Sequence, residues 1–361
     1  MSGTILVPRV RVLSNGQPLP TPIGVEITTN NYYHPSDYSI TWAASSAPGM
    51  WWDVEPPWVL DVQLSTDGST FTTLITGEVD QTTVSVKEGL VSVTGRDYIA
   101  AFIESVTQEL FANQTASEIA TTLAARHNLA AVVTPTTTLA GTFYVQDHAR
   151  TTHGQFSRPR TEWDLLTYLA QREGFDVWVQ GRTLYFQKQV APNKPDFTIA
   201  VDAAAGVTVA NVEQLHMARA LTLAKDIQVD VRSWNSRRKA GFTKSVRAIG
   251  AKVANVAASA NQVGVQSQRY VFVRPNLTEQ QALTLAQTML EQLSRHERNI
   301  EVEMPGETAL TARSLVALTG TGTTFDQNYW IDSMQRRVTA QGFRETLKLK
   351  NHSPGSQVVL S

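Results

Sequence analysis

The chain has 361 residues, which is long enough for two or three domains, and its 42% content of hydrophobic residues supports globular packing. A net charge of −1 argues against a protein that grips nucleic acid through a basic face, and the absence of cysteine excludes disulfides, zinc–thiolate sites and cysteine nucleophiles. The N-terminus lacks the pattern of a secretory signal, and no apolar stretch reaches the roughly 20 residues that cross a bilayer. We therefore expect a protein that is made in the cytoplasm and does not insert into a membrane.

Only 17% of the residues are charged, against about 25% in typical soluble domains. Because interface cores exclude charge, this composition is typical of a chain whose surface is covered by other subunits. A threonine-rich, all-β monomer explains the composition equally well.

Residues 1–95 alternate apolar and polar positions in short runs that Gly, Pro, Asn and Asp separate. Short strands with turn residues between them predict a small antiparallel barrel or sandwich over residues 1–97. The runs are Ile5–Val12, Gly24–Thr28, Tyr38–Ala43, Trp58–Ser65, Phe71–Gly77, Thr83–Val86 and Leu90–Thr94.

Four of the eight tryptophans, Trp42, Trp51, Trp52 and Trp58, lie within the segment WAASSAPGMWWDVEPPW. Exposed tryptophan is costly unless something covers it, and tryptophan is enriched at interface hot spots. We predict a subunit interface at Trp51, Trp52 and Trp58. A platform for stacking sugars and a loop folded back over its own barrel remain as alternatives.

After Asp97 the hydrophobic period becomes helical. A short helix is predicted over Tyr98–Glu104, and Thr115 with Glu118 forms a capping box that opens a second helix near 115–127. Asn128 suits the left-handed position at the end of that helix.

A third helix, near 161–173, begins at Thr161 and ends at Gly174. The strands that follow, within 175–186, pair as a hairpin around Gly181. Residues 130–160 are predicted to be irregular, with one strand at Thr142–Val145. Together these elements predict a small α/β module over residues 98–190.

The segment Ala191–Asp196 reads as a linker, and a second β domain with one helix is predicted over residues 191–361. Thr278 and Gln281 form a capping box for that helix, near 279–296. The segment 252–267 is predicted to be a long loop or arm. The predicted strands are Lys225–Ser233, Ala240–Gly250, Arg269–Arg274, Asn299–Met304, Ser314–Leu318, Tyr329–Arg337 and Gly342–Lys350.

Within the first of these strands, Ile227, Val229 and Val231 share one face, and the strand carries no Pro and no Lys after its first residue. Exposed strand edges are normally blunted by such residues. We therefore predict that this strand pairs with a neighbouring subunit, with Ile227, Val229 and Val231 at the interface.

Candidate chemistry is sparse. The glycine-rich segment Thr319–Thr324 lacks the Lys–Ser/Thr ending and the following helix of a phosphate loop, so a hairpin turn is the better interpretation. His148 and His153, with Asp147 beside them, lack both the spacing and the supporting ligands of a metal site. We predict no metal, no cofactor and no catalytic residue.

Glu162 and Asp164 are the remaining candidates, because paired carboxylates serve as acid and base in glycosidases. Both lie in the first turn of a predicted helix, where the helix dipole favours acidic side chains. This placement explains the two residues without catalysis.

The middle of the chain resembles baseplate hub proteins of contractile-tailed phages, the Mu-like tail protein and late control protein family, which are related to the N-terminal part of type VI secretion spikes. The residues that carry the resemblance are Gly95–Asp97, Asn113–Ser117 and Ala124–Leu129, then TEWDLLTYLAQREGFDVWVQGRTLYF at 161–186. The closing segment, 320–350, resembles the last strands of the family, although Arg336 and Arg337 stand where relatives often carry His.

The resemblance implies a mainly β fold in which two tail-tube-like antiparallel β-barrels flank the α/β module. It implies a non-enzymatic homotrimer in the virion tail baseplate, whose six barrels form a ring. Its partners would be the hexameric tail tube, the trimeric central spike and other baseplate proteins. DNA would pass through the central channel without specific binding. A type VI spike is disfavoured because no needle region follows the second barrel.

A carbohydrate-binding or cell-wall hydrolase module of a phage tail is the alternative. Its support is the tryptophan-rich segment together with Glu162 and Asp164.

Overall fold

The computed structural model describes residues 8–351 apart from residues 32, 48, 107–108, 110, 112, 141–160, 189–191, 203–208, 221–226, 236–238, 248–267, 276 and 295–296. The predicted strand at Thr142–Val145, the histidines 148 and 153 with Asp147, and the predicted arm at 252–267 lie outside the described residues.

Seven strands form the first half of the main sheet, in the order β3-β4-β7-β6-β5-β1-β2, with all neighbours antiparallel. Alternate residues point into a core that contains Ile40, Trp42, Leu60 and Val93. The strands are β1 (Arg9–Ser14), β2 (Gln17–Pro18), β3 (Gly24–Asn30), β4 (Asp37–Ala43), β5 (Val59–Ser65), β6 (Thr72–Ser85) and β7 (Leu90–Asp97); a short 3-10 helix, η1, spans Ala44–Ser46.

Seven strands near the C-terminus form the second half, in the order β13-β17-β20-β19-β18-β11-β12. When the seven strands of each half are numbered in chain order, both halves have the same spatial order of strands. One difference is that β11 pairs parallel with β18, whereas its counterpart β1 pairs antiparallel with β5. The strands are β11 (Phe197–Asp202), β12 (Val209–Ala210), β13 (Gln214–Arg219), β17 (Arg298–Pro305), β18 (Leu315–Thr319), β19 (Gln327–Thr339) and β20 (Gly342–Asn351).

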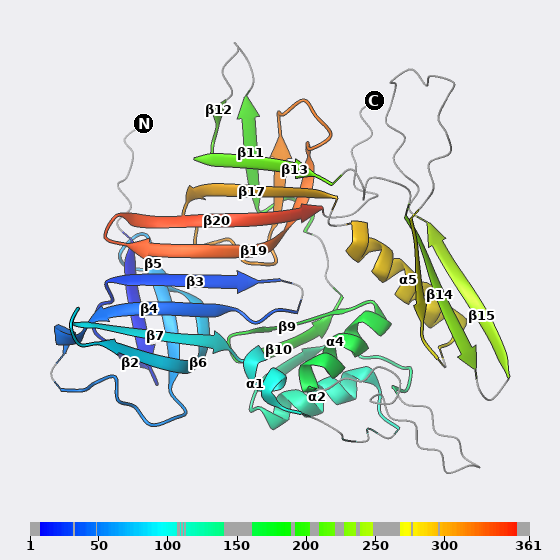
Figure 1. Ribbon diagram of the computed structural model, residues 1–361, viewed down its shortest axis with the longest axis horizontal. Coiled ribbons are helices and arrows are strands. Elements are labelled where there is room, and N and C mark those ends of the chain that lie inside the picture. The colour runs from blue at the N-terminus through cyan, green and yellow to red at the C-terminus, as the bar shows by residue number, and fades with distance from the viewer. Residues whose placement is uncertain are drawn as a thin grey trace.

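The two halves are joined into one sheet by antiparallel pairing of β3 with β19, from Val25 opposite Val338 to Asn30 opposite Ser333. Figure 1 shows β13, β17, β20, β19, β3, β4 and β7 as successive rungs of this sheet. The mainly β prediction is confirmed. Two separate barrels are not: within the described residues neither half closes on itself, although each half has its own core.

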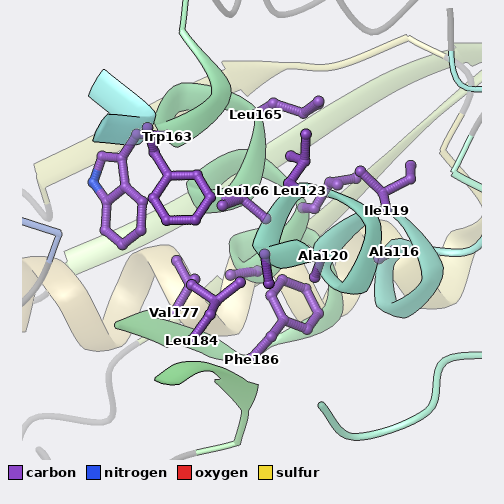
Figure 2. Close-up of a cluster of buried hydrophobic side chains, with 14 of the residues drawn as sticks. Ala116, Ile119, Ala120, Leu123, Trp163, Leu165, Leu166, Val177, Leu184 and Phe186 are labelled. Atoms are coloured by element: carbon purple, nitrogen blue, oxygen red, sulfur yellow. The ribbon is translucent and has the colours of Figure 1, made fainter. Parts of the chain in front are cut away.

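The α/β module lies between the halves in the sequence and packs on the first of them. Its helices α1 (Ile99–Glu104), α2 (Ala116–Arg126) and α4 (Glu162–Glu173) cover a sheet in the order β8-β10-β9. Figure 2 shows Leu123 of α2, Leu166 of α4 and Phe186 of β10 converging in its core. The strands are β8 (Ala130–Val133), β9 (Asp176–Gln180) and β10 (Thr183–Gln187).

Local signals position this module as expected. Thr115 with Glu118 and Thr161 with Asp164 form the two capping boxes, and Asn128 and Gly174 adopt left-handed backbone conformations. The prediction of irregular structure at 130–133 is wrong, because β8 pairs parallel with β10 there. A strand of four residues is too short to show a periodic pattern, and no turn nearby links it to its partner strand.

A fourth unit is inserted between β13 and β17. It consists of the sheet β15-β14-β16 and the helix α5 (Glu279–Ser294), which packs against α4 of the module. Thr278 and Gln281 exchange the capping hydrogen bonds that were predicted. The strands are β14 (Ile227–Asn235), β15 (Ala240–Arg247) and β16 (Gln268–Val273).

Candidate functional site

Eight neighbouring strands of the continuous sheet, from β6 through β3 and β19 to β13, have one polar face, and their other face covers the two cores. Across the strands, Gln81, Thr94, Ser39 and Glu26 stand directly opposite one another in succession. Directly opposed side chains lie on the same face of a sheet, so these residues line a single surface. The same surface continues over the second half through Arg337, Ser333, Lys348, Glu301 and His216.

Charges of both signs alternate on this polar face. Glu26 pairs with Arg337 at 3.3 Å, and Glu301 stands opposite Lys348. A face with balanced charge neither attracts nor repels a polyanion strongly, in contrast to the basic surface that phosphate binding needs.

The long strands of the two halves share a bulge with the same chemistry. In β6 the register against β7 shifts at Asp80, whose carboxylate pairs with Arg96 at 2.6 Å. In β19 the register against β20 shifts at Asp332, whose carboxylate pairs with Lys350 at 2.7 Å. The sequence does not reveal that the two bulges correspond, because the halves share only one aspartate and one distant basic residue at this place.

Besides the outer edges of β1 with β2 and of β11 with β12, where the sheet ends, two further strand edges of the main sheet have no strand partner among the described residues. One is the edge of β6 beyond Val79, where β5 has ended; the other is the edge of β13 that faces away from β17. A row of unpaired backbone groups is a template for pairing with another strand.

Arg313 clamps the three regions of the molecule together. Its Nη1 donates to Asn31 Oδ1 of the first half at 2.8 Å, and its Nη2 donates to Asp176 Oδ2 of the module at 3.1 Å. The guanidinium lies 3.7 Å from the ring centroid of Trp178, which itself stacks on Tyr185. No sequence pattern marks this clamp, because its members come from three regions.

A cavity of about 760 Å³ adjoins this clamp, at the junction of the two halves and the module. Asp97 lies in its wall with 7% of its surface exposed, and its carboxylate accepts hydrogen bonds from the Ser36 and Ile99 amides. Burial raises the pKa of Asp97 to about 6, and the two amide hydrogen bonds oppose the rise.

We expect this carboxyl to make stability depend on pH. The folded pKa is raised above its ordinary value of 3.8, so its contribution to the free energy of unfolding is fully present below pH 3.8 and is lost as the pH rises through about 6. A shift of this size corresponds to about 3 kcal/mol. Urea unfolding of wild type and Asp97→Asn between pH 4 and pH 7 measures it. The difference between the two proteins should change with pH in that window; a constant difference contradicts the prediction.

The tryptophan-rich segment folds back over the end of the first core. Trp58 is buried and donates to Ser14 Oγ at 3.0 Å, so it faces its own chain rather than a partner. Trp51 and Trp52 are half-buried against the same core, with Trp51 edge-on to Trp42 at 5.3 Å between ring centroids. This arrangement matches the folded-back alternative, and an interface at Trp51 and Trp52 stays a prediction.

The prediction for Ile227, Val229 and Val231 is wrong about the strand edge. β14 is the central strand between β15 and β16, so its backbone is paired on both sides. The three side chains are buried against α5 of their own chain. An alternating strand has the same sequence pattern whether a helix of its own chain or another subunit covers it.

Glu162 is more buried than its position in a helix first turn suggested, with 2% of its surface exposed. Its carboxylate pairs with Arg126 and lies 2.6 Å from His127 Nε2, which ties the start of α4 to the end of α2. Asp164 completes the capping box of α4. Both carboxylates thus have structural partners.

The glycine-rich segment 319–324 is the turn between β18 and β19, as predicted, and Asp326 accepts hydrogen bonds from the Thr321 and Gly322 amides. Among the described residues, no three His, Asp or Glu side chains gather as metal ligands would. No described helix has the length and apolar character needed to span a membrane.

Solved structures with a similar fold are phage tail proteins and a secretion-system component. The tail protein from Neisseria meningitidis MC58 has a TM-score of 0.68 and 13% identity, and the match covers 97% of this chain and 98% of that chain. The 43 kDa tail protein of prophage MuSo2 from Shewanella oneidensis has a TM-score of 0.67 and 16% identity, over 97% and 99% of the two chains. The E. coli c3393 protein, described as a component of the type VI secretion system with similarity to T4 bacteriophage tail proteins gp27 and gp5, has a TM-score of 0.54 and 11% identity, over 95% and 77%.

The TM-scores of 0.68 and 0.67 over nearly the whole of both chains establish a shared fold, so the resemblance to phage tail proteins is confirmed at the level of the fold. No curated protein matches the sequence. The family described as the Alg8 N-terminal domain matches residues 67–340, which is more than half of the chain. The chain belongs to the Alg8 N-terminal domain family.

Proposed function

We propose that this protein is the structural hub of a contractile tail baseplate or a related particle, and that it acts as a homotrimer without enzymatic activity. The observation that carries the proposal is the repeated seven-strand order of the two halves, which one continuous sheet joins. Two equivalent units in each chain let three chains present six units to a hexameric partner and threefold symmetry to a trimeric one.

The partners follow from that symmetry. One side of the ring docks the hexameric tail tube, and the other receives the trimeric central spike, with further baseplate proteins around them. Support comes from the similarity in fold to proteins described as tail proteins and as a component of the type VI secretion system. The protein would then reside in the tail of the virion.

The polar face of the sheet is the proposed wall of a central channel. It carries threonines, serines and charges of both signs, including the Glu26–Arg337 pair. DNA passes such a wall without being held, because few phosphates would be neutralised at any one position.

The alternative of a carbohydrate-binding or cell-wall hydrolase module loses its two supporting features. The tryptophan-rich segment packs on the first core, and Glu162 and Asp164 have structural partners. No feature of the described residues favours this alternative over the hub.

The test is the mass of the purified protein in solution. We expect light scattering at micromolar concentration to give three times the 39.7 kDa chain mass, and electron microscopy to show threefold rings with a central hole. A stable monomer at that concentration would overturn the proposal.

A further inference from the structure

Eight neighbouring strands of the main sheet form two copies of a four-strand unit. Their order is β13-β17-β20-β19 followed by β3-β4-β7-β6, and each strand of the first set occupies the same rank in its half as its counterpart in the second. The junction between the copies is the pairing of β19 with β3 (Figure 1). A third copy would therefore begin beyond β6, and its first strand would be another β13.

The open edges of β6 and β13 are the counterparts of the two edges that this junction pairs. β19 first pairs with β18 and then, on the same edge, with β3. β6 likewise first pairs with β5, but beyond Val79 no strand of the described residues takes the place that β3 takes beside β19. β13 pairs with β17 as β3 pairs with β4, and its second edge has no partner in the part of the chain that the structure describes.

The alignment of the two copies rests on matching hydrogen bonds. The bulges place Asp80 and Asp332 as counterparts. Just before them, Val79 N donates to Trp58 O at 2.8 Å and Ile331 N donates to Ser314 O at 3.4 Å.

At the other strand, Ile23 N donates to Thr41 O at 2.7 Å, and Glu213 N donates to Glu303 O at 2.8 Å. In the pairing of each strand with the strand that follows it, Ile27 stands opposite Tyr38, and Met217 stands opposite Ile300. Counted from the two hydrogen bonds, Ile27 is therefore the counterpart of Met217.

This alignment transfers the register of the internal junction to the open edges. Arg336 stands opposite Ile27 inside the chain, so Val84 of one copy would stand opposite Met217 of the next. The full transferred register is Gln81 opposite Ala220, Thr82 opposite Arg219, Thr83 opposite Ala218, Val84 opposite Met217, Ser85 opposite His216 and Val86 opposite Leu215.

Exposed apolar side chains occupy the positions that this register buries. Val84 is 40% exposed, Val86 is 89% exposed and Met217 is 42% exposed. In the internal junction the counterparts of Val86 and Met217, Val338 and Ile27, are 7% and 1% exposed. Pairing the open edges would bury apolar surface in the same way.

The backbone donors of β13 point the right way. Ala220 N donates to Glu297 O of the β17 side, so the alternate amides of Ala218 and His216 point there too. The amides of Met217 and Leu215 therefore point to the open edge. In the internal junction Asn31 N donates to Asp332 O at 2.9 Å, which gives Ile27 the same direction toward β19.

We infer that residues 81–86 of one copy pair antiparallel with β13 of the next copy, in this register. The number of copies that this interface joins rests on the proposed hub function. Head-to-tail pairing closes a ring only when the rotation from one copy to the next fits a fixed number of copies. Three chains of eight strands each would close a ring of twenty-four strands whose core is continuous between copies.

The test is a disulfide between copies, which is clean because the natural chain has no cysteine. In Thr83→Cys/Ala218→Cys the two thiols would face each other in a pair without direct backbone hydrogen bonds, where Cβ atoms lie closest. We expect oxidation to give a covalent trimer on a non-reducing gel and each single variant to give none. Gln81→Cys/Ala220→Cys is a second pair of the same kind.

The internal junction supplies a matched control. Gln335→Cys/Thr28→Cys holds the counterpart positions within one chain and should form its disulfide without a change in mass. Val84→Cys/Ala218→Cys shifts the register by one residue, places the thiols on opposite faces and should not crosslink.

Three results are distinguishable. Covalent trimers from the in-register pairs support the interface. A trimer by light scattering that neither in-register pair crosslinks, while the internal control does, overturns the interface and leaves the hub. A ladder of crosslinked species beyond the trimer supports the strand pairing and overturns the closed ring of three.

Discussion

Replacing Met217 with proline should dissociate the trimer and leave the single chain folded. The Met217 amide points to the open edge of β13, so proline removes a donor that only the neighbouring copy would use. Proline is tolerated on an edge strand where the amide faces outward. Light scattering should fall from three chain masses to one, with the circular dichroism spectrum and thermal midpoint of the remaining chain close to those of a dissociated wild-type chain.

Ala218→Pro is the matched control, one residue along the same strand. The Ala218 amide points to β17, so proline there removes a hydrogen bond inside the sheet and should destabilise the chain by about 1–3 kcal/mol. If Met217→Pro remains trimeric, or if both prolines unfold the chain equally, the assignment of the open edge is wrong.

The single change Arg336→Met should lower the free energy of unfolding by about 3–5 kcal/mol, because it strands a buried carboxylate. Arg336 Nε donates to Glu345 Oε1 at 2.6 Å, and Nη2 donates to Leu310 O at 2.5 Å. Glu345 is 1% exposed, and burial raises the pKa of its carboxyl while the neighbouring guanidinium opposes the rise.

The repeat suggests the rescue of that variant. The counterparts of Arg336 and Glu345 in the first half are Val84 and Val91, so an apolar pair is compatible with this position of the unit. Arg336→Met/Glu345→Leu should therefore recover at least half of the loss, because a buried ion pair can be replaced by apolar side chains at little net cost. Urea unfolding measures both variants. A double variant as unstable as the single one would show that the hydrogen bond to Leu310 O, rather than the stranded carboxylate, dominates.

The helices and turns of the α/β module could be predicted from sequence because their signals are local. Thr115 and Thr161 each cap a helix by hydrogen bonding to the residue three positions later, and Gly174 ends the helix that directly precedes it. The same holds for the turn that follows β18, where Asp326 holds the Thr321 amide. Most strands of the two halves were also predictable, since alternation with a period of two needs no knowledge of the partner strand.

The sites could be predicted less well, for the same reason. The alternation of Ile227, Val229 and Val231 identifies a buried face, but α5 rather than another subunit covers it. The sequence indicates that the Trp58 side chain must be buried, and residues of its own chain bury it. Glu162 was explained by the helix dipole, whereas Arg126 and His127, some 35 residues earlier in the chain, decide its burial.

The sequence by itself determined the mainly β character, the position and ends of the helices, and the absence of thiol chemistry. The tertiary structure decided the order of the strands, the single sheet that β3 and β19 create across 300 residues, and the repetition of one topology in two halves that share little sequence. Strand pairing is made by backbone groups that every residue carries, so side chains reveal that a strand exists and which face is buried but not which strand lies beside it.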